Sequence, residues 1–253
     1  MPGTAPALFI GHGSPMYAIT ENPYTAAWAA LAKRFPKPKA VLCVSAHWET
    51  EGIRVTTSAQ PRTIHDFYNF PRELYQLTYP APGAPELAER IADVLSARAE
   101  SEWGLDHGAW SVLRVLFPNA DVPVIQLSLD KRESPAGHYA IGKRLAGLRD
   151  EGVLVLGSGN IVHTLRLHRG AVAPYDWAIK FDGRVKQKIA ENDHGALTDY
   201  DSLSEEAALA VPTPEHYLPL LYMLAVCRAG EKPEFLTEDV TGAISMRSVA
   251  VGV

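Results

Sequence analysis

Short apolar runs alternate with longer amphipathic stretches along most of this chain. Apolar runs bounded by Gly, Pro or polar residues are typical of buried strands, and apolar positions three or four residues apart predict helices. The predicted strands cover residues 7–11, 40–46, 52–58, 122–129, 153–159, 234–239 and 244–252. The predicted helices cover residues 22–35, 84–98, 109–117, 135–150, 160–167, 176–191 and 215–229.

This order of elements predicts one α/β domain spanning residues 1–253, with a mixed or largely parallel central sheet covered by helices. Asn22 is the expected cap of the first helix, because Pro23 fits the first helical position. Residues 59–80 are rich in proline and aromatic side chains and are predicted to form a long loop. A loop of that length in a compact domain is usually functional.

The composition is that of an ordinary globular protein and excludes several classes. Hydrophobic residues make up 47% and charged residues 21% of the 253 positions, which excludes a disordered chain or a coiled coil. The net charge of −5 argues against nucleic acid as the main partner. No apolar run reaches the ~18 residues of a membrane span, and no signal peptide is recognisable. Cys43 and Cys227 lie in apolar runs, which favours buried thiols in a reducing, cytoplasmic setting.

Histidines stand where a site is expected. His12, His47, His163 and His216 follow predicted strands or open predicted helices. Ligands of α/β proteins lie beyond the carboxyl ends of the strands, and imidazole binds Fe, Zn, Cu and Ni. The pattern therefore predicts a metal site built from separate segments.

A hydrogen-bonded structural role is the alternative for any single histidine at the end of a strand. That role is preferred for His138, His168 and His194, which fall on predicted helix surfaces or surface loops. GSGN at 157–160 could bind an anion at a helix N-terminus. The glycine patterns of nucleotide-binding loops are absent, as are GxSxG, HExxH and CxxC.

A set of segments taken together resembles one family. The segments are GHGSPM (11–16), VSAHWE (44–49), TIHDFYNFP (63–71), YPAPG (79–83), LDHGAWSVL (105–113), VPVIQLS (122–128), GSGNIVH (157–163) and VPTPEHYLPLLY (211–222). Their order and spacing, from about residue 6 to 251, are similar to the class III extradiol ring-cleaving dioxygenases, and within them to the bacterial and plant 4,5-DOPA dioxygenase type. The resemblance implies an α/β fold, a non-haem metal centre and cleavage of a catechol ring by O₂ next to its diol.

The resemblance also implies a ligand set. His12 and His47 match the two histidine ligands of the family. The third ligand is a glutamate in more distant members, whereas the 4,5-DOPA type uses the histidine of TPEH. Glu215 and His216 are neighbours that point about 100° apart on a helix, so we favour His216 and keep Glu215 as the alternative. His163 matches the acid/base histidine and is expected as a fourth ligand when zinc fills the site.

The remaining residues are implied as parts of the substrate pocket. His107 matches a histidine near the O₂ and substrate pocket, in a helping catalytic role. The expected pocket wall consists of His65, Phe67, Tyr68 and Phe70. A substrate carboxylate would meet a cation, for which the sequence offers Arg62, Arg72 and Arg247, each with a surface role as its default.

Three functions compete at this stage. The first is an extradiol dioxygenase that uses Fe(II), since three protein ligands leave three positions for the diol and O₂. Its expected partners are a small aromatic diol such as L-DOPA, cleaved at the 4,5 bond, and O₂, without nucleic acid or membrane; a homo-oligomer is compatible with the sequence. Zn(II) can occupy the same histidines but has no redox chemistry. The alternatives are a zinc-dependent hydrolase and a non-catalytic binding module of the same fold.

Overall fold

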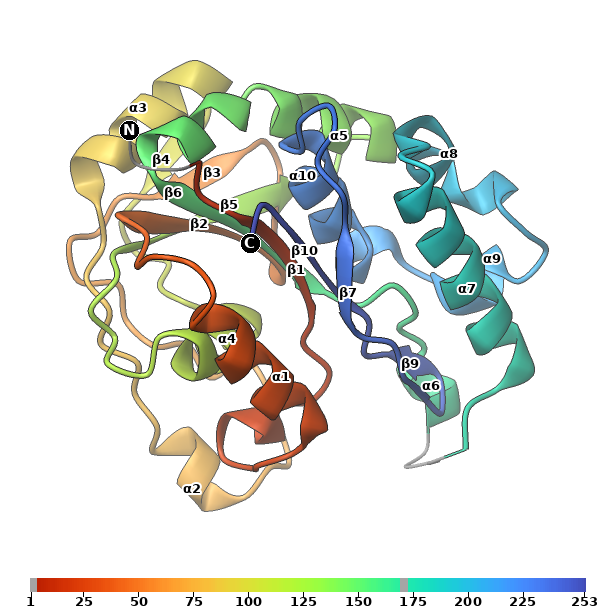
Figure 1. The fold of residues 1–253 in the computed structure, drawn as a ribbon. Coiled ribbons are helices and arrows are strands. Elements are labelled where there is room, and N and C mark those ends of the chain that lie inside the picture. The colour runs from red at the N-terminus through yellow and green to blue at the C-terminus, as the bar shows by residue number, and fades with distance from the viewer. Residues whose placement is uncertain (1–3, 169–172) are drawn as a thin grey trace.

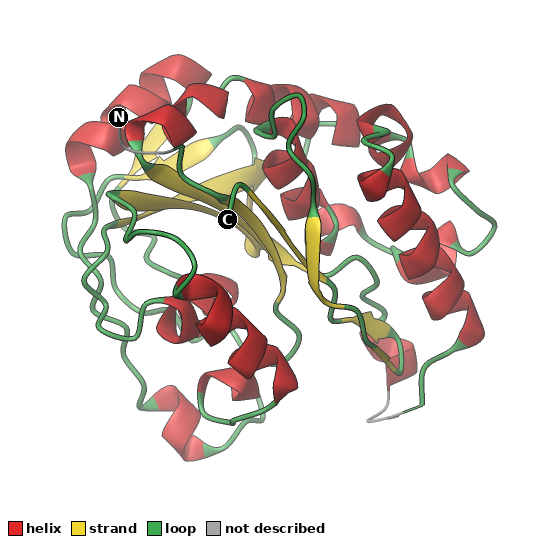
Figure 2. Ribbon diagram, viewed as in Figure 1, coloured by secondary structure: helices red, strands yellow, loops and turns green. Residues whose placement is uncertain are grey.

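An eight-stranded sheet runs through the middle of the molecule and carries helices on both faces (Figure 1, Figure 2). The computed structural model describes residues 4–168 and 173–253. The strand order is β4-β3-β5-β2-β6-β1-β10-β7. The strands are β1 Ala7–Gly11, β2 Ala40–Thr50, β3 Arg54–Thr56, β4 Arg98–Glu100, β5 Val124–Asp130, β6 Val153–Gly159, β7 Glu234–Thr237 and β10 Ser248–Val251. A separate hairpin pairs β8 Val240–Thr241 with β9 Ile244–Ser245.

The four central strands β5, β2, β6 and β1 are parallel, so their carboxyl ends meet at one edge of the sheet. Strand β10 pairs antiparallel with β1, and β7 pairs antiparallel with β10. On the other side, β3 is antiparallel to β5 and parallel to β4. The predicted mixed, largely parallel sheet within a single α/β domain is therefore confirmed.

Ten α-helices and four short 3₁₀ helices are present within the described residues. The α-helices are α1 Pro23–Ala32, α2 Arg72–Tyr75, α3 Pro85–Leu95, α4 His107–Leu116, α5 Pro135–Lys143, α6 Leu165–His168, α7 Asp176–Ala190, α8 His194–Thr198, α9 Ala207–Ala210 and α10 Leu218–Ala225. The 3₁₀ helices are η1 Pro15–Ala18, η2 Ala146–Glu151, η3 Tyr200–Ser202 and η4 Pro214–His216. Asn22 caps α1 as predicted, with its side chain accepting hydrogen bonds from the next turn.

Two hydrophobic cores lie on the two faces of the sheet. Side chains alternate along a strand, so Leu8 and Ile10 of β1 pack with α1 and α4, whereas Phe9 packs with α3, α5, α7 and α10. The central strands are buried on both faces, which explains their continuous apolar sequences. Figure 1 shows α1 and α4 together on one side of the sheet.

Element boundaries differ from the predictions where backbone geometry intervenes. Strand β2 continues past residue 46 to Thr50, so His47 lies inside the strand rather than after it. The predicted helix 135–150 is α5 followed by η2, and the predicted helix 215–229 is η4 followed by α10. The short strands β4 and β8 were not predicted, because three or two residues carry too little periodicity. The long loop is confirmed, since α2 is its one helix within residues 59–80.

His138 corrects a prediction, because it lies in the core rather than on a helix surface. Its side chain is 1% exposed, and its Nδ1 lies 3.0 Å from the hydroxyl of Tyr222 on α10. Cys43 is buried as expected, while Cys227 is only partly buried, and both thiols are free. Across the described residues, no helix combines the length and the apolar character that a membrane crossing requires.

Burial of His138 predicts a pH-dependent stability. Burial lowers the pKa of His138 to about 4. Between pH 6.5, the ordinary pKa of histidine, and about pH 4, His138 is therefore protonated in the unfolded chain but neutral in the folded protein. The stability present above pH 6.5 should therefore fall as the pH drops through this window, by roughly 3 kcal/mol. Urea unfolding of the wild type and of His138→Gln at several pH values measures this, and the variant should lose that part of the slope. Parallel slopes for the two proteins would contradict it.

Candidate active site

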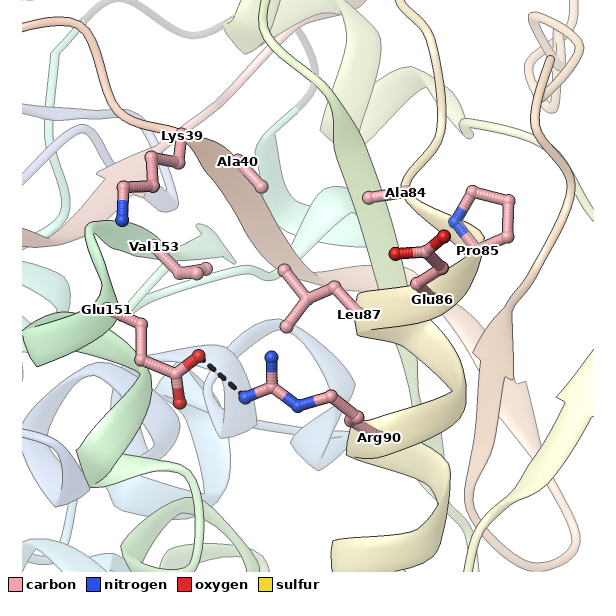
Figure 3. A pocket seen from close by; sticks show the side chains of 9 residues that line it. All are labelled: Lys39, Ala40, Ala84, Pro85, Glu86, Leu87, Arg90, Glu151 and Val153. Atoms are coloured by element: carbon pink, nitrogen blue, oxygen red, sulfur yellow. Dashed lines mark hydrogen bonds and ion pairs between the residues drawn. The ribbon is translucent and has the colours of Figure 1, made fainter.

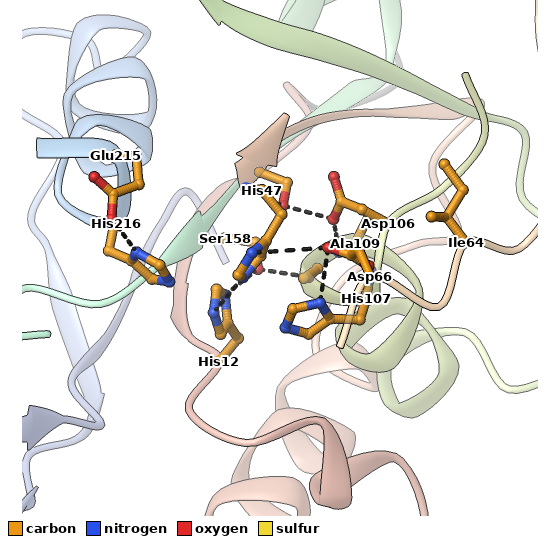
Figure 4. Close-up of polar contacts among 12 residues, drawn as sticks. His12, His47, Ile64, Asp66, Asp106, His107, Ala109, Ser158, Glu215 and His216 are labelled. Atoms are coloured by element: carbon orange, nitrogen blue, oxygen red, sulfur yellow. Dashed lines mark hydrogen bonds and ion pairs between the residues drawn. The ribbon is translucent and has the colours of Figure 1, made fainter. Parts of the chain in front are cut away.

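Histidines from four segments converge at the carboxyl edge of the central strands (Figure 4). His12 directly follows β1, and His47 lies in β2 where the pairing with β5 shifts register between Val44 and Glu49. His12 Nε2 and His47 Nε2 are 3.2 Å apart. One ring nitrogen of His216, at the end of η4, lies within 4.8 Å of both.

The end of β6 holds the backbones of two of these histidines. The amide of His12 donates to the carbonyl of Gly159, at 3.0 Å, and the amide of Asn160 donates to the carbonyl of His216, at 2.9 Å. Successive residues of one chain segment thus position two histidines that are far apart in sequence. The 3₁₀ helix η4 is brought directly over the sheet edge in this way.

Ser158 determines which nitrogen of His12 faces the cluster. The Ser158 hydroxyl donates to the carbonyl of Gly108, at 2.6 Å, and lies 3.0 Å from His12 Nδ1. Because its single hydrogen is already used, the Ser158 oxygen can only accept, so His12 carries its proton on Nδ1. The lone pair of His12 Nε2 therefore points toward His47.

His216 is held in the same manner by its neighbour. Its Nδ1 lies 3.1 Å from Oε1 of Glu215, and its buried Nε2 has no hydrogen-bond partner in the described part of the chain. The ring stacks on that of His163, with centroids 3.4 Å apart and planes 13° apart. Glu215 faces His216 and His163 and does not join the group of His12, His47 and His216.

Burial keeps these imidazoles neutral. Burial lowers the pKa of His12 and of His216 well below 6.5, with the neighbouring histidines adding to the effect. Burial and the nearby His107 lower the pKa of His47 to about 3, and burial lowers the pKa of His163 to about 4. Neutral imidazole is the form that binds a metal ion.

The donor set fits a divalent cation. Two nitrogen ligands of one ion at 2.0–2.1 Å stand about 2.9–3.4 Å apart, which includes the 3.2 Å between the two Nε2 atoms. Two lone pairs at that distance repel each other unless a cation or a proton lies between them. The buried, unpartnered Nε2 of His216 is a third donor of the same kind.

A second group lies against the first and contains a residue that the sequence did not reveal. His107 Nδ1 is 2.9 Å from Oδ2 of Asp66, a short polar contact that lacks the alignment of a hydrogen bond. His47 Nδ1 is 3.8 Å from the same oxygen. Burial alone would raise the pKa of Asp66, but the contacts with His107 and His47 outweigh it and lower that pKa. The one sequence signal was its place beside His65 in the long loop.

The residues expected to form the aromatic wall lie in different surroundings. Phe67 is buried, and its ring centroid is 5.6 Å from that of His107 and 5.3 Å from that of Phe70. His65 lies beside Phe67, with Nε2 2.9 Å from the carbonyl oxygen of Leu77. Tyr68 is 83% exposed, so its side chain faces solvent and does not line the wall.

The three arginines have different surroundings. Arg247 is 4% exposed, not a surface residue, and its guanidinium pairs with Asp182 and Glu238. Its donors are therefore occupied away from the histidines. Arg62 lines a cavity of about 500 Å³ together with His47, whereas Arg72 is an exposed residue at the start of α2. The stacked rings of Trp48 and Trp103 line the same cavity as Arg62.

Another cavity, of about 620 Å³, opens at the amino ends of β2 and β6, away from the histidines (Figure 3). The ion pair between Arg90 and Glu151, at 2.6 Å, crosses its lower part. Its lining residues are Lys39, Ala40, Ala84, Pro85, Glu86, Leu87, Arg90, Glu151 and Val153. None of them is a predicted site residue, so the cavity does not compete as the active site.

Comparison with known proteins gives the class of this site. Residues 6–251 match the family described as the catalytic LigB subunit of aromatic ring-opening dioxygenase. The chain belongs to this family, and it is a metal-dependent extradiol dioxygenase that opens aromatic rings. The resemblance found in the sequence is thereby confirmed.

Particular relatives cover nearly the whole chain. It is 43% identical to a 4,5-DOPA dioxygenase extradiol of Escherichia coli K12, over 98% of this chain and 94% of that protein. It is 39% identical to a protein of the same name from Beta vulgaris, over 93% and 92% of the two chains. A crystal structure of an uncharacterized Escherichia coli K12 protein superposes with a TM-score of 0.85, at 40% identity, covering 98% of this chain and 99% of that one.

Gly108 provides a test of how tightly α4 packs on the histidines. A Cβ atom on Gly108 would lie 2.6 Å from Ser45 Oγ and 2.8 Å from His47 Cδ2. Gly108→Ala should therefore displace the His47 ring and weaken metal binding by roughly 10–100-fold, the usual effect of disturbing the support of a ligand. Gly183→Ala on α7 is the matched control, because a Cβ there meets nothing within 4 Å. Metal titration of both variants measures the effect, and equal affinities would contradict it.

Proposed function

We propose that this dioxygenase cleaves the ring of L-DOPA or a closely related catechol at the 4,5 bond, using Fe(II) held by His12, His47 and His216. The observation that carries the ligand assignment is the convergence of three ring nitrogens, two of them 3.2 Å apart and the third buried without a hydrogen-bond partner among the described residues. Glu215 then supports His216 through its Nδ1 and is not itself a ligand.

A bound ferrous ion supplies the redox chemistry that O₂ requires, which zinc lacks. The protein supplies everything else. Phe67 and the neighbouring aromatic residues exclude water from the side of the site where a flat ring can lie. The three histidines would hold the ion with positions left open for the diol and O₂, which would keep the reactants adjacent and oriented.

His163 is the proposed acid and base of the reaction. Its ring is stacked on His216, and its backbone is fixed by a hydrogen bond from its amide to the carbonyl of Ala210, at 3.0 Å. A neutral imidazole at this place can take a proton from a catechol hydroxyl and return it later. Since it lies beside a ligand, it is also the proposed fourth ligand when zinc is bound. His107 is the proposed helper on the opposite side of the cluster.

The choice of substrate follows the relatives, whose names specify 4,5-DOPA. Arg62 is the proposed contact of a substrate carboxylate, because it shares a cavity with His47 while the guanidinium of Arg247 is already paired. O₂ is the proposed second substrate. A cytoplasmic setting and a homo-oligomeric state stay predictions from the sequence.

Metal reconstitution tests the proposed function. Full-length protein loaded anaerobically with Fe(II) should consume one O₂ for each L-DOPA and form a yellow ring-opened product. Zinc-loaded protein should be inactive on catechols, and His12→Ala should not bind iron, because two remaining ligands rarely hold a divalent ion. Oxygen uptake, visible absorbance and metal content are measured on the same preparations. Hydrolysis of esters by the zinc protein, with catechols untouched by the iron protein, would favour the hydrolase instead.

The role of His163 has its own test. His163→Gln should retain iron, because His12, His47 and His216 are unchanged, while turnover falls by roughly 10²–10⁴, the usual contribution of a general acid and base. Iron content and catechol-dependent O₂ uptake are compared in one preparation. Loss of iron in step with activity would make His163 a required ligand. Unchanged activity would return it to a structural role.

A further inference from the structure

Asp66 is placed between two histidines of the site, although it belongs to no predicted ligand set. Its Oδ2 is 2.9 Å from His107 Nδ1 and 3.8 Å from His47 Nδ1. Its Oδ1 accepts a hydrogen bond from the backbone amide of His107, at 2.8 Å. Both oxygens of the carboxylate are thus directed at the first residue of α4 (Figure 4).

The long loop is fastened to α4 immediately next to this contact. The amide of Ile64 donates to the carbonyl of Leu105, and the amide of Leu105 donates to the carbonyl of Arg62, both at 2.8 Å. The indole of Trp110 on α4 donates to the carbonyl of Ile64, at 2.8 Å. These bonds fix the loop two residues before Asp66, so the carboxylate is held in place by tertiary contacts.

The charge of Asp66 decides where His107 carries its proton. A lone pair on Nδ1 would lie 2.9 Å from the negative carboxylate oxygen and be repelled, so the hydrogen resides on Nδ1. The lone pair of His107 is then on Nε2, while Nδ1 is buried and makes no aligned hydrogen bond among the described residues. The ring itself lies against the site, with its centroid 3.9 Å from that of His47 and 6.0 Å from that of His12.

We propose that Asp66 is a positioning residue that fixes His107 in the Nδ1–H tautomer, so that Nε2 can accept a hydrogen bond from a substrate hydroxyl. The present contact is short but not aligned, and catalytic hydrogen bonds commonly tighten when substrate binds. The tautomer assignment stands on the geometry alone, whereas its effect on turnover rests on the proposed function.

Asparagine is the informative replacement, because it keeps the shape of Asp66 but has one acceptor instead of two. If the amide oxygen of Asp66→Asn continues to accept from the His107 backbone, its NH₂ group faces His107 Nδ1. Nδ1 must then become the acceptor, and the proton moves to Nε2. The lone pair that should meet the substrate is replaced by an N–H group.

Nitrogen NMR of the full-length protein tests the tautomer without any measurement of activity. Spectra of ¹⁵N-histidine-labelled protein are recorded metal-free and zinc-loaded, since zinc is d¹⁰, and His107→Gln identifies the His107 signals. The wild type should show His107 protonated on Nδ1, and Asp66→Asn should show it protonated on Nε2. An Nε2–H tautomer in the wild type, or an unchanged tautomer in the variant, would overturn the proposal.

Kinetics of the iron-loaded protein test whether Asp66 acts through His107. Asp66→Asn should lower kcat by roughly 10²-fold or more, per bound iron, with a smaller change in KM. The same substitution added to His107→Gln should cost almost nothing further. Asp121→Asn is the matched control, because Asp121 pairs with Lys37 on the surface, and it should leave kcat unchanged.

The outcomes separate the two claims. An equal loss from Asp66→Asn in both backgrounds would show that Asp66 acts independently of His107 and would overturn the proposal, as would a loss explained wholly by missing iron. If the wild type opens no catechol ring, the proposed function fails, and the nitrogen spectra still decide the assignment of Asp66.

Discussion

The close approach of η4 and α10 to the end of β6 is the constraint on which the site depends. The backbone carbonyl of His216 accepts a hydrogen bond from the amide of Asn160, and the backbone amide of His12 donates one to the carbonyl of Gly159. This approach is available only to glycine, since a Cβ on Gly159 would lie 2.1 Å from the carbonyl oxygen of His216, and one on Gly157 would lie 2.3 Å from that of Pro219. In the Gly-Ser-Gly ending of β6, the two glycines therefore permit close packing of η4 and α10, and Ser158 contacts His12.

Ser158 of the same Gly-Ser-Gly segment orients a histidine ring through its Nδ1, and other oxygens do the same for two further rings. Three of the rings have Nδ1 next to an oxygen: that of Ser158 for His12, Glu215 for His216, and Asp66 for His107. An acceptor on Nδ1 leaves the lone pair on Nε2, and such partners orient metal ligands and raise their basicity. Asp66 differs from the other two because it serves a ring outside the ligand set and also lies near His47.

Burying several imidazoles together is costly for their charged forms, which is why burial lowers the pKa of each of His12, His47, His163 and His216. The lowered pKa values favour cation binding, because only the neutral imidazole has a free lone pair for a metal ion. Arg247, directly before β10, is instead paired with Asp182 in the core. The buried guanidinium of Arg247 is thus paired with a carboxylate, whereas these four imidazoles are neutral.

The sequence by itself determined the α/β class, the parallel centre of the sheet and the family, because strand and helix periodicities and the histidine-bearing segments are local properties of the chain. It also indicated His12 and His47, because residues that follow parallel strands meet at one edge of the sheet, whereas the choice of His216 came from the family resemblance. It did not reveal Asp66 or Ser158, and it misplaced His138 and Tyr68. Asp66 meets a residue 41 positions away and Ser158 one 146 positions away. Contacts over such separations carry no periodic signal, so only the packing of the loop on α4, and of β6 under η4, decided them.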